Sequence, residues 1–228
     1  MRGRIVAVAT VAACLVASAP AGAQDWQQVP HWPGKMTATH SFESPDIPTG
    51  SWNTFGSIPY WTATTHCGIE VQDNVAGAPA VGGQFVELNS NCPSGIRYTI
   101  DIGNRHRYIE GRFAFSPRPY TQAQDNVMQV LFDGRVLAVR NTATNAYAQT
   151  IGPAVGGATT KWSWYSFRVG DVPAGVHTLT FRSVGTNPSG GGVGTYLDHV
   201  TLEREVACDE YGGTWCQQGG ALPGYEIP

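Results

Sequence analysis

The stretch NVMQVLFDGRVLAVRN, residues 126–141, decides the fold class. In its first half Met128, Val130 and Phe132 fall on one face of an extended chain, because side chains alternate along a strand. Asp133-Gly134 separates two such runs, and this dipeptide is a strong signal for a two-residue hairpin turn. The stretch therefore predicts an antiparallel β-hairpin.

Segments with similar alternation recur along the chain between turn residues. Nowhere does an apolar stripe with the period of a helix last for several turns. Strands are therefore predicted over 37–43, 58–65, 68–73, 84–90, 95–102, 106–116, 126–132, 135–141, 161–169, 175–184 and 193–204. Strands of this length and spacing are typical of an all-β sandwich or barrel of antiparallel sheets.

The alternation also predicts which face of each strand is buried. One apolar face per strand is what a two-layer sandwich requires. Besides the hairpin, the residues predicted to face the core are Ile69, Val71, Val86, Leu88, Ile109, Phe113, Phe115, Tyr165, Phe167 and Val169. Their neighbours in sequence are predicted to point outward.

The chain begins with the features of a secretory signal peptide. Arg2 and Arg4 precede an apolar run over 5–17, and Ala21-Gly22-Ala23 supplies a cleavage site of the Ala-x-Ala type. The apolar run is shorter than the roughly 18 residues that a membrane-spanning helix needs. The sequence therefore predicts removal of residues 1–23 and a protein that is secreted or periplasmic, without a membrane span.

The remaining chain reads as one domain with two flanks. Residues 24–35 carry Trp and Pro without periodicity and are predicted to be a leader segment. Residues 36–206 hold the strands, and 207–228 form a Gly-rich tail. The net charge is −3, which provides no basic surface for nucleic acid. Charged residues are only 14% of the chain, and that suits an extracellular β protein.

Four cysteines follow the signal peptide, and an even number in an exported protein indicates disulfides. The favoured pairs are Cys67–Cys92 and Cys208–Cys216, because the second pair closes a short Gly-rich loop. A zinc site is the alternative. It lacks the usual closely spaced Cys or His pairs.

Five short motifs occur in order: SFESP (41–45), IPYW (58–61), GQFVELN (83–89), FSPRP (115–119) with DNV (125–127), and YLDHVTL (196–202). Together they resemble the galactose-binding-like jelly-roll domains of bacteria and plants, which include the DUF642 group. The chain departs from that pattern at His40 and Tyr60, where glycine is usual, and at Pro117 and Pro119 beside Arg118.

The resemblance covers about 36–205 and implies a jelly roll of two antiparallel sheets with a carbohydrate or cell-surface polymer as partner. Related carbohydrate-binding modules hold a structural calcium where the first and last strands meet, and Glu43 and Asp198 match the acidic positions there. Calcium prefers hard oxygen ligands such as carboxylates. The alternative is that Glu43 accepts turn hydrogen bonds and that Asp198 caps a strand end.

Binding a sugar requires flat apolar surface for the ring and converging polar groups for the hydroxyls. The predicted polar ligand-binding residues are Glu70, Glu87, Asn89, Arg112 and Gln129 on outward faces, with Arg118 and Asp125 in the loop before the hairpin. The alternative is a solvated face carrying cross-strand ion pairs.

Tryptophans are the candidate platforms for a sugar ring. Trp162 and Trp164 are two apart on one predicted strand and share a face. The alternative is that they pack beneath a loop. Trp61 is expected in the core, and Trp52 fits either role.

The sequence predicts a non-catalytic binding protein and leaves two further hypotheses open. A structural extracellular or envelope component fits the low charge and the disulfides equally well. A glycan hydrolase needs two carboxylates about 5 to 10 Å apart, for which Glu70 and Glu87 are the candidates. No Gly-x-Ser-x-Gly or His-Glu-x-x-His motif is present, so no catalytic residue is predicted.

Overall fold

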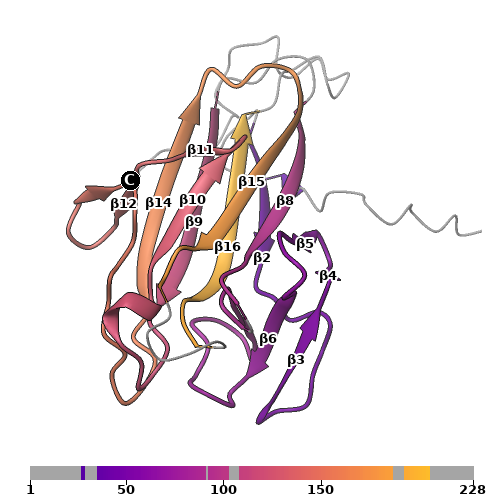
Figure 1. Cartoon of the computed structure of the whole chain (residues 1–228). Coiled ribbons are helices and arrows are strands. Elements are labelled where there is room, and N and C mark those ends of the chain that lie inside the picture. The colour runs from indigo at the N-terminus through magenta and orange to yellow at the C-terminus, as the bar shows by residue number, and fades with distance from the viewer. Residues whose placement is uncertain (1–26, 29–34, 91, 103–107, 187–192, 206–228) are drawn as a thin grey trace, which may run out of the picture.

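The computed structural model describes residues 27–28, 35–90, 92–102, 108–186 and 193–205 (Figure 1). Its elements are β1 (Gln27–Gln28), β2 (Lys35–His40), β3 (Ser51–Phe55), β4 (Ser57–Ile58), β5 (Trp61–Ala63), β6 (Ile69–Asp73), β7 (Phe85–Glu87), β8 (Gly95–Ile102), β9 (Tyr108–Ser116), the 3₁₀ helix η1 (Ala123–Asp125), β10 (Met128–Phe132), β11 (Arg135–Val136), β12 (Val139–Asn141), β13 (Tyr147–Ala148), β14 (Ser163–Gly170), β15 (Gly175–Ser183) and β16 (Tyr196–Glu205).

These strands form two antiparallel sheets, which confirms the predicted all-β sandwich. The ten-stranded sheet has the order β13-β12-β14-β9-β16-β7-β6-β3, and β2 also pairs with β16 and with β1. The six-stranded sheet has the order β11-β10-β15-β8-β5-β4. The predicted pairing of the first long strand with the last is present, because β2 runs beside β16 (yellow in Figure 1).

The core lies between the two sheets and consists of the residues that the alternation points inward. Ile109, Phe113 and Phe115 are at most 3% exposed, and Val86 and Leu88 at most 1%. Trp61 is 1% exposed and packs on Tyr98 and Phe181, as expected for a core tryptophan. Tyr165 and Val169 are only partly buried at the margin of this core.

Several strand boundaries differ from the sequence-based prediction. The predicted strand 58–65 is divided into β4 and β5 by a turn at Tyr60, whose φ is 71°. The predicted strand 135–141 divides into β11, which stays beside β10, and β12, which joins the other sheet. The sequence does not predict β3, because SWNTF has no apolar alternation. Gln27–Gln28, inside the predicted leader, pair with β2.

The disulfide Cys67–Cys92 is present, with a Cα–Cα distance of 5.9 Å, and it confirms that predicted pair. Cys208 and Cys216, the signal peptide 1–23 and the tail 207–228 lie outside the described residues. Within the described part of the chain, no helix is long and apolar enough to cross a membrane.

The Asp133-Gly134 hairpin turn has the geometry that the sequence predicts. Both residues have positive φ, 47° and 77°, as a type I′ turn requires. The Asp133 carboxylate also contacts β15, because its Oδ2 lies 2.6 Å from Nδ1 of His177. The other ring nitrogen of His177 lies 2.8 Å from the Pro173 carbonyl oxygen. His177 is therefore a strand histidine held between two acceptors.

The substitution Asp133→Asn is expected to lower the unfolding free energy by no more than about 1 kcal/mol at pH 5.5, since the Asp133 side chain is 44% exposed. Burial lowers the pKa of His177, but its hydrogen bonds to Asp133 and Pro173 raise that pKa above the ordinary 6.5. Burial raises the pKa of Asp133, but the hydrogen bond from His177 brings it below the ordinary 3.8.

The pH dependence of the stability lost in Asp133→Asn shows whether the Asp133–His177 ion pair is the cause. The raised pKa of His177 contributes stability that is full below pH 6.5 and disappears as the pH rises through the folded-state value. The lowered pKa of Asp133 contributes stability that is full above pH 3.8 and disappears as the pH falls through its folded-state value. Urea unfolding should therefore show a larger loss at pH 5.5 than at pH 9. Asparagine keeps the turn, so an equal loss at both pH values would contradict this account.

Candidate functional site

A groove lies over the outward face of β3 and β6, on the side away from the core. It consists of two adjoining cavities of about 340 and 580 Å³, which share Val75, Ala76 and Arg118 as lining residues. The first cavity is also lined by Trp52, Glu70, Gln72 and Ser90. The second is also lined by Gly77, Ala78, Pro119, Tyr120, Thr121, Ala158, Thr159, Thr160 and Val193. We call the two cavities together the groove.

The strand register explains why acidic residues meet beneath the groove. Glu70 on β6 is the Cα partner of Glu87 on β7, and Glu87 is the partner of Tyr196 on β16. Residues directly opposite on neighbouring strands share a face. The predicted candidates Glu70 and Glu87 are therefore side by side.

Glu87 is the centre of a buried polar network. The Gln72 amide donates from Nε2 to Glu70 Oε1 at 2.7 Å and to Glu87 Oε2 at 2.6 Å. Arg118 donates from Nη1 to both oxygens of Glu87, at 3.0 and 2.8 Å. The backbone amide of Gly194 donates to Glu87 Oε1 at 2.8 Å. The Glu87 carboxylate therefore connects the loops that carry Arg118 and Gly194 to the sheet.

The network perturbs the acid–base properties of its members. Burial raises the pKa of Glu87 well above its usual range, and the attraction of Arg118 opposes that shift. Burial also raises the pKa of the Tyr196 hydroxyl, and the nearby Glu87 carboxylate adds to the effect. Perturbed groups beneath a concave surface are a common feature of functional sites.

Two exposed aromatic residues belong to the groove, one in each cavity. Trp52 on β3 is 55% exposed and is the Cα partner of Gln72. Tyr120 is 83% exposed and lines the second cavity. The sequence left the role of Trp52 open because β3 has no alternation, and it gave no signal for Tyr120, which lies in a loop with positive φ (61°).

Loops cover most of the predicted outward face of β6 and β7, so the alternative of a solvated face does not describe it. Glu87 and Asn89 are 0% exposed and Glu70 is 6% exposed. The Asn89 amide donates to the Val193 carbonyl at 2.9 Å, so it supports the groove from below. The physical reason is that loops fold over this face, which alternation within a strand does not reveal.

Asp125 and Gln129 lie away from the groove lining. Asp125 is 0% exposed, and its carboxylate accepts a hydrogen bond from the Gln122 amide at the start of η1. Gln129 is on β10 of the other sheet, where it accepts a hydrogen bond from Arg182 at 2.8 Å. The sequence could not separate the two sheets, and it therefore placed Gln129 in the wrong group.

The two predicted platform tryptophans take different positions. Trp162 packs edge-on against Phe85, and its Nε1 donates to the Ala78 carbonyl at 2.9 Å, so it supports the groove wall as packing. Trp164 lies on β14 beside Arg112, whose guanidinium carbon is 5.9 Å from the ring centroid. Neither Arg112 nor Trp164 lines the groove.

The Glu43 and Asp198 carboxylates both accept hydrogen bonds from the 80–84 segment, which follows the groove-lining residues 75–78. Asp198 Oδ2 accepts hydrogen bonds from the amides of Ala80 and Val81 at 2.8 and 3.0 Å. The Glu43 carboxylate accepts from the amides of Gly83 and Gln84, at distances of 3.1 to 3.3 Å.

These contacts bear on the calcium that the resemblance implies. Burial raises the pKa of Asp198 to about 7, the backbone donors oppose that shift, and the charge of Glu43 adds to it. Calcium takes six to eight oxygen ligands. The backbone N–H groups beside the Glu43 and Asp198 carboxylates instead direct their hydrogen atoms at the carboxylate oxygens. The described arrangement fits the hydrogen-bonded alternative, and calcium binding stays a prediction.

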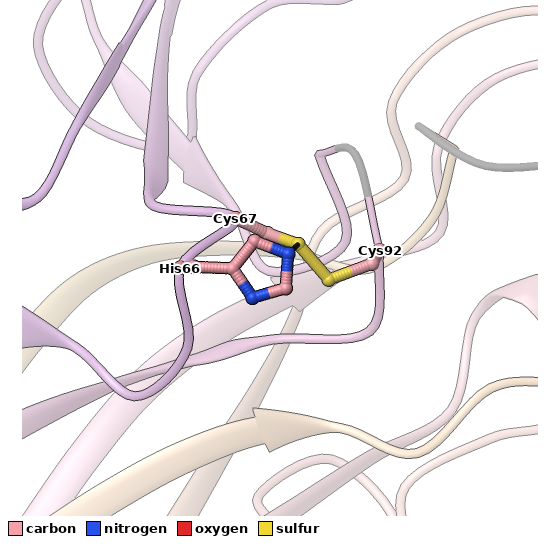
Figure 2. Close-up of side chains that lie close together, drawn as sticks. All are labelled: His66, Cys67 and Cys92. Carbon is pink, nitrogen blue, oxygen red and sulfur yellow. Dashed lines mark hydrogen bonds between the residues drawn. A yellow bond between two sulfur atoms is a disulfide. The ribbon is translucent and has the colours of Figure 1, made fainter.

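A separate cluster brings His66, Cys67 and Cys92 together, with ligand atoms within 4.8 Å of one another (Figure 2). His66 Nε2 lies 3.7 Å from Cys67 Sγ. The two sulfur atoms are bonded to each other, and a metal ligand must be a thiolate. The cluster is therefore a disulfide with a neighbouring histidine, and its oxidised form offers no zinc site.

No family model matches the sequence, and no curated protein is similar to it, so the likeness to the DUF642 group has no support of that kind. The structure is a distant match to β-sandwich carbohydrate-binding modules. One is a family 35 carbohydrate-binding module from Clostridium thermocellum, with 9% identity, a TM-score of 0.39, and coverage of 73% of this chain and 96% of that one.

Two further solved structures match at a similar level. The CBM22-1 xylan-binding domain of Paenibacillus barcinonensis Xyn10C has 14% identity, a TM-score of 0.41, and coverage of 75% of this chain and 95% of that one. The Stig cyclase Fisc from Fischerella sp. TAU has 14% identity, a TM-score of 0.45, and coverage of 73% of this chain and 94% of that one. Because binding modules and a cyclase match alike, these likenesses do not indicate a function.

Proposed function

We propose that this chain is an exported, non-catalytic protein that binds carbohydrate in the groove. Its signal-peptide features support export. The groove combines the two features that sugar binding requires, an accessible aromatic ring and polar groups set in a concave surface. The partner would be a cell-wall or extracellular polysaccharide.

The observation that carries this proposal is the position of Trp52. Trp52 is 55% exposed although it lies on a strand, and it lines the same cavity as Glu70 and Gln72. A sugar ring stacked on the indole would bury apolar surface, which stabilises a complex by roughly 25 cal/mol per Å². The polar side chains beside the ring are suited to the hydroxyl groups.

Binding is favoured over hydrolysis because of the state of Glu87. Its carboxylate is fully buried and accepts hydrogen bonds from Gln72, Arg118 and Gly194. A general acid or nucleophile must reach the glycosidic bond. In this arrangement Glu87 orients Arg118, and Glu70 is the carboxylate that lines the cavity.

Trp52→Ala is expected to weaken retention on polysaccharide and to raise the apparent Kd about tenfold, the loss of one aromatic contact. The measurement is a depletion assay of the secreted protein on insoluble cellulose, xylan, mannan, chitin and β-1,3-glucan. Tyr147→Ala is the matched control, because Tyr147 is 70% exposed on β13 and does not line the groove.

Each arm of this assay has a defined reading. Retention of the native protein on one polymer, with loss in Trp52→Ala only, supports the proposal. Equal retention of the native and Trp52→Ala proteins would contradict the groove as the site. Release of reducing sugar would favour the hydrolase, and absence of retention on every polymer would favour a structural role. A parallel arm with a chelator tests the calcium prediction.

A further inference from the structure

The two cavities of the groove adjoin each other on the surface. Val75, Ala76 and Arg118 line both, so the two cavities share a boundary made of these residues. Ligand pockets of about 300 to 1,000 Å³ hold drug-sized molecules, which are larger than one sugar ring. The cavities, at about 340 and 580 Å³, together exceed what a monosaccharide would fill.

Each cavity has its own exposed aromatic ring. Trp52 lines the first cavity only, Tyr120 lines the second only, and the shared residues lie between them. One pyranose ring cannot stack on both aromatic side chains if they belong to different cavities. A ligand that uses both must therefore contain several sugar units in a row.

The charges in the groove disfavour an acidic ligand. Among the described residues that line the two cavities, the charged side chains are Glu70 and Arg118. Arg118 is already bound to the buried Glu87 carboxylate, so its charge is compensated within the protein. A uronate or sulfate group in the first cavity would meet the Glu70 carboxylate, and like charges repel.

The 76–78 segment, which lines the groove, is held in place before any ligand arrives. The Tyr196 hydroxyl donates to the Ala76 carbonyl at 3.1 Å, and Trp162 Nε1 donates to the Ala78 carbonyl at 2.9 Å. The Thr160 hydroxyl also donates to the Ala78 carbonyl, at 2.9 Å. A preformed surface reduces the ordering cost of binding a long ligand.

We infer that the groove takes an internal segment of a linear, uncharged polysaccharide, laid across both cavities with Trp52 and Tyr120 under different sugar units. This inference rests on the proposed carbohydrate-binding function and narrows it to a ligand class. It excludes monosaccharides and acidic glycans as main ligands. It also gives Tyr120 a role in binding that its loop position alone does not suggest.

The test is calorimetric titration of the native protein with xylo-, cello-, manno- and laminari-oligosaccharides of two to six units, and with oligogalacturonides as charged probes. For the neutral series that binds, the affinity should rise at least tenfold from two to five units. Trp52→Ala and Tyr120→Ala should each lower the affinity for the five-unit ligand about fivefold to tenfold. Tyr147→Ala should not change it.

The outcomes separate this inference from the proposed function. Equal affinity for two-unit and five-unit ligands, or an unchanged affinity in Tyr120→Ala, would overturn the inference while leaving carbohydrate binding intact. Tighter binding of oligogalacturonides than of every neutral series would overturn the uncharged ligand class. Absence of binding to all oligosaccharides and to all insoluble polymers would overturn both proposals together.

Discussion

Arg118→Met is expected to lower the unfolding free energy by about 3 kcal/mol, because it leaves a buried carboxylate without its cation. Glu87 is 0% exposed, and Arg118 Nη1 lies 2.8 Å from its Oε2. Removing one partner of a buried ion pair costs about 3 to 5 kcal/mol. The Arg118 side chain is 24% exposed, so water screens part of the interaction and the lower end of that range applies.

Urea unfolding at several pH values tests this account. Burial raises the pKa of Glu87 and Arg118 opposes the shift, so removal of Arg118 should raise that pKa further. A raised carboxyl pKa means that the folded state takes up the proton first, and stability then falls as the pH rises through the folded-state value. The Arg118→Met variant should therefore continue to lose stability up to a higher pH than the native protein does.

A double variant separates the unpaired charge from lost packing. Glu87→Gln combined with Arg118→Met removes both charges, and it should recover at least half of the lost stability. A double variant as unstable as Arg118→Met alone would show that packing of the Arg118 side chain is the cause. A loss of stability in Arg118→Met that does not change with pH would also indicate that lost packing is the cause.

Much of the fold follows from the sequence because strand patterns are local. The alternation in 106–116 and 126–132 predicts β9 and β10 with core residues in the correct places. The Asp133-Gly134 turn is also local, since two residues with positive φ suffice to define it. The order of strands in the sheets depends on long-range pairing, and nothing in the alternation determined it.

The candidate site could be predicted only in part, for the same reason. Glu70, Glu87 and Arg118 come together as the sequence suggested, because two of them are opposite each other on neighbouring strands. Gln129 belongs to the other sheet, and Trp162 lies beneath a loop that arrives from elsewhere in the chain. Such placements depend on which loop covers which strand.

The covering loops also explain why the outward polar residues are buried. In a two-layer sandwich, a residue that points away from the core normally meets water. Here the 74–83 segment lies over that face, held by the Asp198 and Glu43 carboxylates and by Trp162. The polar residues below it satisfy one another in a network, as buried polar groups must. The groove is the part of this face that the loops leave open.

Removal of the Cys67–Cys92 bond by the double substitution Cys67→Ala and Cys92→Ala is expected to cost about 3.5 kcal/mol. The bond closes a loop with a sequence separation of 25, and the chain-entropy model gives about this value for such a loop. For a domain of this size the melting temperature should fall by about 10 °C. Thermal unfolding followed by circular dichroism measures it.

Reductant supplies the control for this variant. The native protein, reduced with a dithiol, should lose most of this difference in melting temperature. The double variant should respond less to the reductant, because it keeps only the predicted Cys208–Cys216 pair. Equal melting of the oxidised and reduced native protein would contradict a stabilising role for the bond.

Loss of the disulfide should also weaken polysaccharide binding, because Ser90 lines the groove and stands two residues before Cys92. A higher Kd for polysaccharide in the reduced protein would reveal this link between the disulfide and the proposed function.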